Sequence, residues 1–354
     1  MAMDVAGLTG WLDNQAAVGQ FSGVALIWRD GAPVLSFAGG VAERRFATPI
    51  RFDTRFAVGS VTKVVVAAAC LRLVDQGLVG LHQPLIDVLP SDQQPDALTP
   101  AHHLHHLLSH TSGLANYHDT LSTSWASFLS AWDRVPTYHA RGPADLLPLF
   151  MHLPATGPPG VEFAYADANY VLAGLVIEAI TGQPWTEFAT AEVLGPAGMV
   201  DSGFPYLDND PPRLATGYLV TDEPQERWLS NVYSVPAGGM PDGGLVTTAT
   251  DLARLFDALE GGGLLSPTAH AAMTTPQDPD REVLERYGYG CVVTVQDNRV
   301  TIIGHDGMDP GVSASVSRYR DAATTIVVVS NQDRGCWPVV ARLAAEAALD
   351  DPRS

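Results

Sequence analysis

The apolar run at residues 64–74 is the feature that most constrains how this chain can fold. A helix that is apolar on nearly all faces belongs in a protein core and not at its surface. Gly77 follows the run, where a left-handed residue commonly ends a helix, and Ser60 precedes it, where a hydroxyl can cap free N–H groups. The valines at 64–66 are poor helix formers, so packing must hold the helix together. The sequence therefore predicts a buried helix that begins near Ser60 and Lys63.

Ser60 and Lys63 are three residues apart, so a helix places their side chains on one face. A serine hydroxyl becomes a strong nucleophile only when a base removes its proton. Lysine can be that base if its pKa falls, and burial and the helix dipole both lower it. Lys63 is the only lysine among 20 basic residues, and the arginines stay protonated. Although Ser-x-x-Lys also arises by chance, its position before a buried helix favours catalysis.

The composition is typical of a soluble protein with a large core. The chain has 354 residues, of which 46% are hydrophobic, and a formal net charge of −19. This acidic excess argues against nucleic acids and anionic membranes as partners. Cys70, Cys291 and Cys336 are too far apart to show metal or disulfide spacing. No basic residue precedes Arg29 and no signal-like apolar segment is present, so we expect a cytoplasmic location, unless a leader was removed. The oligomeric state stays open.

Local patterns predict strands at both ends of the chain and helices between them. The expected strands are 24–28, 34–37, 289–295, 299–303, 312–319 and 324–330. The further expected helices are 8–18, 102–108, 168–180, 186–194, 252–259 and 337–349. Short turns between the strands favour an antiparallel sheet. We therefore predict an α+β fold in one catalytic unit (1–354), with an α/β lobe (1–78 and 245–354), an inserted helical lobe (79–244) and a site between them.

Three motifs together resemble the serine β-lactamase and D,D-peptidase superfamily. They are Ser60-Val-Thr-Lys63, Tyr165-Ala-Asp167 and His305-Asp-Gly307. Residues 107–114 and 243–252 also look like connecting segments of the branch that contains class C β-lactamases, D-aminopeptidases and family VIII esterases. The resemblance runs from about residue 21 to 331. It implies a β-lactamase-like fold and acyl-enzyme chemistry without a metal or an organic cofactor.

The resemblance also implies a role for each motif residue. Ser60 would attack a carbonyl carbon, and Lys63 would accept or relay the proton. Tyr165 would act with Lys63 as the base and then as the acid toward the leaving group, which is consistent with an ammonium lowering the pKa of an adjacent phenol. The backbone N–H groups of Ser60 and of Met308, which follows Gly307, would form the oxyanion hole.

Two of the motifs differ from the usual family pattern. Asp167 stands where asparagine is usual; an ionised carboxylate cannot donate to a substrate carbonyl, and it would instead hold the lysine charged and shift the base role to the tyrosine. The third motif has His305 in place of lysine, with Asp306 and Met308 where hydroxyl residues often stand. This pattern weakens the β-lactamase interpretation. The same pattern predicts that substrates with a free carboxylate beside the scissile bond bind poorly, unless the Asp306 side chain points to solvent.

The histidines at 102, 106 and 110 are spaced so that they could share a helical face and bind zinc. However, His106 and His110 stand where the resembled family commonly has structural histidines, so we expect no metal site.

Three classes of function stay open from the sequence. The first is a serine hydrolase that uses an acyl-enzyme on an amide or ester of a small molecule or short peptide, of the D-amino-acid peptidase, amidase or carboxylesterase type. The second is an acyltransferase or peptide cyclase with the same acyl-enzyme. The third is a β-lactamase or a non-catalytic β-lactam-binding protein.

Overall fold

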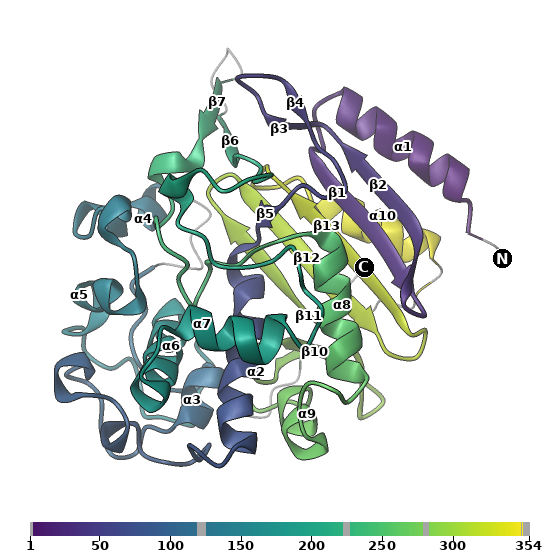
Figure 1. The fold of residues 1–354 in the computed structure, drawn as a ribbon. Helices are drawn as coiled ribbons and strands as arrows, with labels where there is room; N and C mark the ends of the chain where they lie inside the picture. The colour runs from purple at the N-terminus through teal and green to yellow at the C-terminus, as the bar shows by residue number, and fades with distance from the viewer. Residues whose placement is uncertain (1–2, 119–124, 222–226, 279–282, 348, 350–354) are drawn as a thin grey trace.

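The computed structural model describes residues 3–118, 125–221, 227–278, 283–347 and 349. Across these ranges, the largest sheet has seven strands in the order β2-β1-β13-β12-β11-β10-β9 (Figure 1). Its strands are β1 Gly23–Arg29, β2 Ala32–Gly39, β9 Glu285–Tyr287, β10 Val292–Gln296, β11 Arg299–Asp309, β12 Val312–Tyr319 and β13 Thr324–Ser330. Every neighbouring pair is antiparallel. Because β1 pairs with β13, segments from both ends of the chain form one sheet, which confirms the predicted α+β class.

The remaining strands are short and form two-stranded pairs. They are β3 Val41–Glu43, β4 Thr48–Pro49, β5 Phe56–Ala57, β6 Tyr218–Thr221, β7 Arg227–Ser230 and β8 Val246–Thr247. The α-helices are α1 Val5–Ala17, α2 Thr62–Asp75, α3 Leu104–Leu108, α4 Trp125–Leu129, α5 Leu147–Phe150, α6 Asp167–Thr181, α7 Trp185–Ala189, α8 Ala249–Glu260, α9 Pro267–Met273 and α10 Trp337–Glu346. Short helical turns include η1 Gly59–Val61, η7 Thr190–Leu194, η8 Leu207–Asn209 and η9 Asn231–Tyr233. No helix in the described ranges is long and apolar enough to cross a membrane.

Helices cover both faces of the large sheet, and β13 shows how the sequence directs this. Successive side chains of a strand point to opposite faces. Ile326 and Val328 pack in a core with residues of α1 and α10, whereas Val327 and Val329 join the larger core that includes α2 and α8. Figure 1 shows α8 and α10 on opposite sides of the sheet. The uninterrupted apolar run of β13 is therefore explained by burial on both faces.

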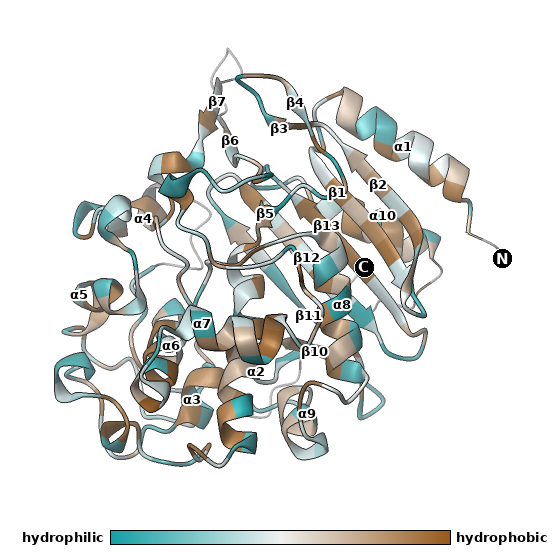
Figure 2. Ribbon diagram, viewed as in Figure 1, coloured by the Kyte–Doolittle hydropathy of each residue, from teal (hydrophilic) through white to brown (hydrophobic). Residues whose placement is uncertain are grey.

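The predicted core helix is α2, which lies where the sheet meets the helical part of the chain (Figures 1 and 2). Its residues from 62 to 71 are all buried. Gly77 adopts a φ of +71°, and the amides of Gly77 and Leu78 donate to the carbonyls of Val74 and Leu73, each at 3.0 Å. This is the paired hydrogen bonding of a Schellman ending, so the predicted helix end is confirmed.

Helices α3 to α7 gather beside the sheet in Figure 1, and α6 packs against α2. The proposed lobe boundaries at residues 78 and 244 stay a prediction. Two strands are clearly longer than expected: β2 covers Ala32–Gly39 where 34–37 was predicted, and β11 continues from residue 303 to Asp309. Gly304 and Gly307 look like strand breakers in the sequence, yet they pair with Ser317 and Ala314 of β12.

Candidate active site

Ser60 lies in η1, the single turn directly before α2. Gly59 precedes it with a φ of +50°, a conformation that glycine adopts most readily. The hydroxyl of Thr62 donates to the carbonyl of Gly59 (2.7 Å) and accepts from the amide of Leu245 (2.9 Å), which fixes the turn against the segment that leads to β8. The start of α2 has no side-chain capping hydrogen bond. The predicted capping role of Ser60 is therefore wrong, and its side chain instead meets Lys63.

The side chain of Lys63 is completely buried. Its Nζ atom donates to Ser60 Oγ at 2.9 Å, to Asp167 Oδ1 at 2.8 Å and to the backbone oxygen of Asp242 at 2.7 Å. An ammonium group has three N–H donors, so each one has an acceptor here. The fold thus brings Ser60, Lys63 and Asp167 together, as the motifs suggested.

The surrounding charges keep Lys63 protonated. Burial alone lowers its pKa, but attraction to Asp167, Tyr165 and Asp242 outweighs burial and raises the pKa above the ordinary lysine value. The lowering expected from burial and the helix dipole is therefore outweighed. The shift agrees with the expectation that Asp167 would hold the lysine charged, and Asp242, which the motifs did not indicate, adds to it. For Asp167 the two effects have the opposite signs. Burial raises the pKa of this carboxyl group, but the attraction of Lys63 helps to lower it by more, so the net pKa lies below the ordinary aspartate value.

Tyr165 precedes α6, and the centre of its ring lies 5.1 Å from Lys63 Nζ. Burial raises the pKa of the phenol, Lys63 lowers it and Asp167 raises it, and the net value lies above the ordinary tyrosine pKa. The lowering that we expected from the ammonium is present but is outweighed. In the resting site Tyr165 is therefore a neutral phenol beside a charged lysine.

His110 holds the segment that carries Tyr165. Its ring centre lies 4.2 Å from that of Tyr165, and its Nδ1 accepts from the amide of Ala166 at 3.2 Å. The His110 carbonyl accepts from the amide of Ala164 at 2.8 Å. Burial and then Lys63 lower the pKa of His110 well below the ordinary value, so this ring is neutral. His110 thus has a structural role: it packs against the Tyr165 ring and fixes the backbone on both sides of this residue.

The other histidines of the series at 102, 106 and 110 also make local contacts. His106 Nδ1 accepts from the amide of His103 at 3.1 Å, and His102 Nδ1 accepts from the amide of Thr99 at 3.0 Å. Within the described ranges, no three His, Cys, Asp or Glu side chains are placed to hold a metal ion.

The third motif lies on β11 where this strand passes the turn that carries Ser60. Strand β10 pairs with β11 only as far as Gly304, which leaves the following residues as an edge beside η1. A Cβ atom on Gly307 would lie 1.9 Å from the Val58 oxygen and 3.1 Å from the Ser60 nitrogen. A Cβ atom on Gly59 would lie 3.0 Å from the Met308 nitrogen. The absence of side chains at Gly59 and Gly307 thus lets the backbones around Ser60 and Met308 approach closely.

His305 is buried and uncharged. Its Nδ1 lies 2.5 Å from the carbonyl oxygen of Asp306, which can only accept, so Nδ1 carries the proton. Its Nε2 lies 2.9 Å from the hydroxyl of Tyr287 and accepts from it. Burial and then Lys63 lower its pKa to about 3. The positive charge of the usual lysine therefore has no counterpart at position 305 at neutral pH.

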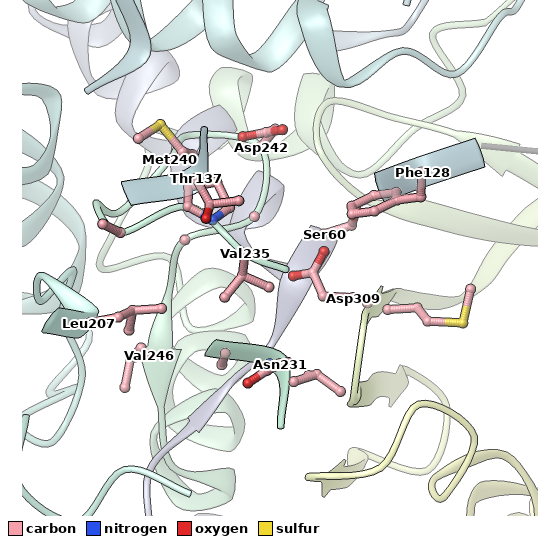
Figure 3. Close-up of a pocket in the computed structure, with 18 of the residues that line it drawn as sticks. Ser60, Phe128, Thr137, Leu207, Asn231, Val235, Met240, Asp242, Val246 and Asp309 are labelled. Atoms are coloured by element: carbon pink, nitrogen blue, oxygen red, sulfur yellow. The ribbon is translucent and has the colours of Figure 1, made fainter. Parts of the chain in front are cut away.

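A pocket of about 900 Å³ opens over these groups (Figure 3). Ser60, Tyr165, Asp167 and residues 305–309 line its polar side. Aromatic side chains line another part: Tyr117, His118, Trp125, Phe128 and Trp132. Asp306 and Met308 are exposed and also line the pocket, so the pocket gives access to the carboxylate of Asp306. The pocket therefore offers space for an apolar group next to a polar site.

Sequence reasoning missed Asp242, Tyr117 and Asn116. The carboxylate of Asp242 accepts a short hydrogen bond from the Tyr117 hydroxyl, and burial raises the pKa of Asp242 to about 6. Asn116 Oδ1 accepts from the amide of Asp167 at 2.9 Å, at the start of α6. The only local signal for Asp242 was its position before two glycines.

Comparisons with known proteins identify relatives of similar sequence and similar fold. Esterase EstB of Burkholderia gladioli is 32% identical over 252 residues, which cover 68% of this chain and 60% of the esterase. A penicillin-binding protein from Bacillus halodurans has a solved structure with a TM-score of 0.86 and 35% identity, covering 94% of this chain and 98% of that one. A D-stereospecific amidohydrolase from Streptomyces sp. superposes with a TM-score of 0.75 and 25% identity, covering 94% and 95% of the two chains.

The match to a whole family is the broadest of these findings. The model of the Beta-lactamase family matches residues 8–349, nearly the entire chain. The resemblance that the three motifs indicated is thereby confirmed. The protein belongs to the Beta-lactamase family and is a serine hydrolase of the β-lactamase and D,D-peptidase superfamily.

Proposed function

We propose that the protein hydrolyses an amide or ester of a small molecule or short peptide through an acyl-enzyme on Ser60. The observation that carries this proposal is the 2.9 Å contact between Ser60 Oγ and the buried ammonium of Lys63 at the side of a large pocket. Ser60 Oγ would form a bond to the substrate carbonyl carbon as the bond to the leaving group breaks. Water would then cleave the resulting ester and free Ser60.

In this proposal Tyr165 handles the proton and Lys63 stays charged. The phenolate of Tyr165 would take the proton of Ser60 and later give it to the leaving group. The adjacent ammonium stabilises that phenolate, and its fixed position supports the arrangement. Since burial and Asp167 hold the Tyr165 pKa above its ordinary value, the reactive fraction grows as the pH rises.

The amides of Ser60 and Met308 would stabilise the oxyanion in this scheme. Their support is the close passage of β11 past η1, which the glycines at 59 and 307 permit. Backbone donors fixed in this way need no reorganisation when charge develops on the carbonyl oxygen.

We propose that the preferred substrates have no free carboxylate beside the scissile bond. His305 is uncharged, and the exposed carboxylate of Asp306 lines the same pocket. The names of the similar esterase and amidohydrolase fit an ester or amide bond as the target.

The test is covalent labelling followed by a substrate panel. Intact-mass spectrometry with an aryl phosphonate should show one added group on the wild type and none on Ser60→Ala. Ser234→Ala, a serine between the pocket residues Tyr233 and Val235, is the matched control and should label normally. A label that persists in Ser60→Ala would contradict the assignment. A p-nitrophenyl ester, a D-alanyl anilide, a D-Ala-D-Ala peptide and a chromogenic cephalosporin would then define the substrate.

A further inference from the structure

Three carboxyl groups lie around the single ammonium of the site. Asp167 forms the ion pair with Lys63, and Asp242 binds Lys63 only through its backbone oxygen. Asp309 is the third, and it lines the same pocket beside Ser60 (Figure 3). With all three ionised, the charge of this cluster is strongly negative, because His305 and His110 are neutral.

Asp309 has an oxygen placed against bare backbone. Its Oδ2 lies 3.2 Å from the position of a Cβ on Gly59 and 3.7 Å from that of a Cβ on Gly243. These glycines adjoin Ser60 and Asp242 in the chain. Among the residues that the structure describes, the half-buried Asp309 side chain has no hydrogen-bond or ion-pair partner.

Asp242 has a second unused acceptor in the same region. One of its oxygens accepts from Tyr117, whereas Oδ1 is buried without a hydrogen-bond partner in the described structure. A buried carboxylate oxygen without a donor is costly. Burial and the neighbouring carboxylates accordingly raise the pKa of Asp242 to about 6 and that of Asp309 to about 8. A positively charged group bound in the pocket beside Asp242 and Asp309 would offset the repulsion between these carboxylates. It would also give the unpaired oxygen of Asp242 a hydrogen-bond donor.

A metal ion does not fit this position, because the described carboxylates and histidines nowhere form a set placed to hold one. An ammonium group carries the same sign and supplies N–H donors to separate acceptors. We propose that Asp309, assisted by Asp242, binds a primary ammonium on the acyl part of the substrate, next to the carbonyl that Ser60 attacks. The substrate class is then an amino-acid amide or ester, or a short peptide with a free amino terminus.

This inference rests on the proposed acyl-enzyme function, and it adds the residues that select the substrate. Asp309 directly follows Met308, whose amide is proposed to hold the carbonyl oxygen, and Gly59 directly precedes Ser60. The ammonium and the scissile carbonyl would therefore be neighbours, as they are in an aminoacyl group. The aromatic part of the pocket remains for the side chain or the leaving group.

The first experiment uses the wild-type protein alone. Alaninamide of either configuration, N-acetylalaninamide and propionamide would compete against hydrolysis of p-nitrophenyl propionate. Removal of a charged hydrogen bond weakens binding by about tenfold or more, so one alaninamide enantiomer should inhibit at least about tenfold more strongly than the two neutral amides. Equal inhibition by all of them would overturn the amine site.

The second experiment assigns the effect to Asp309. Asp309→Asn should raise the inhibition constant of alaninamide by about tenfold or more, and Asp309→Glu should restore part of the loss. Asp210→Asn is the matched control, since Asp210 is exposed and lines the same pocket, and it should leave that constant within about twofold. An equal effect of Asp210→Asn and Asp309→Asn would overturn the assignment.

The two proposals fail in different ways. Ester hydrolysis that persists in Ser60→Ala would contradict the acyl-enzyme on Ser60. Hydrolysis that depends on Ser60 but shows no preference for the amine would contradict only the role of Asp309.

Discussion

The carboxylate of Asp167 lies 2.8 Å from the Nζ atom of Lys63, and this pair sets the proton affinity of the site. Asp167 raises the pKa of Lys63 and also that of Tyr165. Asparagine has nearly the same shape and could still accept a hydrogen bond from the ammonium, but it carries no charge. A single substitution can therefore separate the charge of Asp167 from its geometry.

Asp167→Asn should shift the rising limb of the pH–rate profile to lower pH. With the negative charge removed, both the lysine and the tyrosine lose their protons more readily, and the reactive phenolate forms at lower pH. The measurement is kcat/KM for a neutral ester between pH 6 and pH 10, on the wild type and the variant. A limb that moves to higher pH would show that the carboxylate promotes loss of the tyrosine proton.

Lys63 and Tyr165 should behave as one unit in mutational tests. Lys63→Ala and Tyr165→Phe should each lower kcat/KM by roughly two orders of magnitude or more, and the double variant should lose little beyond the worse single variant. The reason is that the phenolate needs the ammonium beside it, so removing either group disables both. Additive losses, or a nearly active Tyr165→Phe, would argue for independent roles.

Substrates with a free carboxylate should be poor ones. A like charge at about 4 Å costs roughly 1 kcal/mol in bulk water and several times that near a protein surface. We therefore expect kcat/KM for a D-Ala-D-Ala acid to lie below that of its methyl ester, and Asp306→Thr to narrow the difference. If the wild type prefers the free acid, the idea is wrong.

Mild acid should destabilise the fold. Burial lowers the folded-state pKa of His106 and of His118 to about 4, whereas histidines of the unfolded chain titrate near about 6.5. Between these values the unfolded chain binds more protons, so the free energy of unfolding falls as the pH drops from about 6.5 to about 4. Asp242 and Asp309, with raised pKa values, act in the opposite direction. The histidines outnumber these two carboxyl groups, because burial also lowers the pKa of His102, His105, His110 and His305. The net effect of mild acid is therefore a loss of stability.

Urea unfolding at pH 7 and at pH 5 measures this effect. The loss of stability between the two values should be smaller in His106→Gln, which cannot titrate, than in the wild type. His152→Gln changes an exposed histidine and should leave the loss unaltered. A wild type that is equally stable at both pH values would rule out the histidine mechanism.

The local features of this fold were predictable, whereas its long-range electrostatics were predictable only in part. Strand β13 has the predicted bounds because its apolar residues leave few alternatives, and the meeting of Ser60 with Lys63 follows from helical spacing alone. The largest cause that raises the Lys63 pKa is Asp167, which the second motif indicated, whereas the further contribution of Asp242, 179 residues away in the chain, had no signal in the sequence. A contact between residues so far apart in the chain can be identified only from the folded structure.

The length of β11 shows the same limit in secondary structure. Its glycines favour a break when they are read in isolation, but pairing with β12 carries the strand on to Asp309. The edge beside Ser60 therefore depends on tertiary contacts that overrule local preference.

The pairing of Gly23 in β1 with Ser330 in β13 governs when the enzyme can be completed during its synthesis. A ribosome releases β1 long before it makes β13, so the nascent chain must wait with an unpaired strand edge that invites association with other chains. The turn with Ser60 also emerges well before the strand segment at residues 304–309 against which it packs. A competent nucleophile is therefore expected only after residues 304–309 have been translated, and chains that end before them should show no hydrolytic activity.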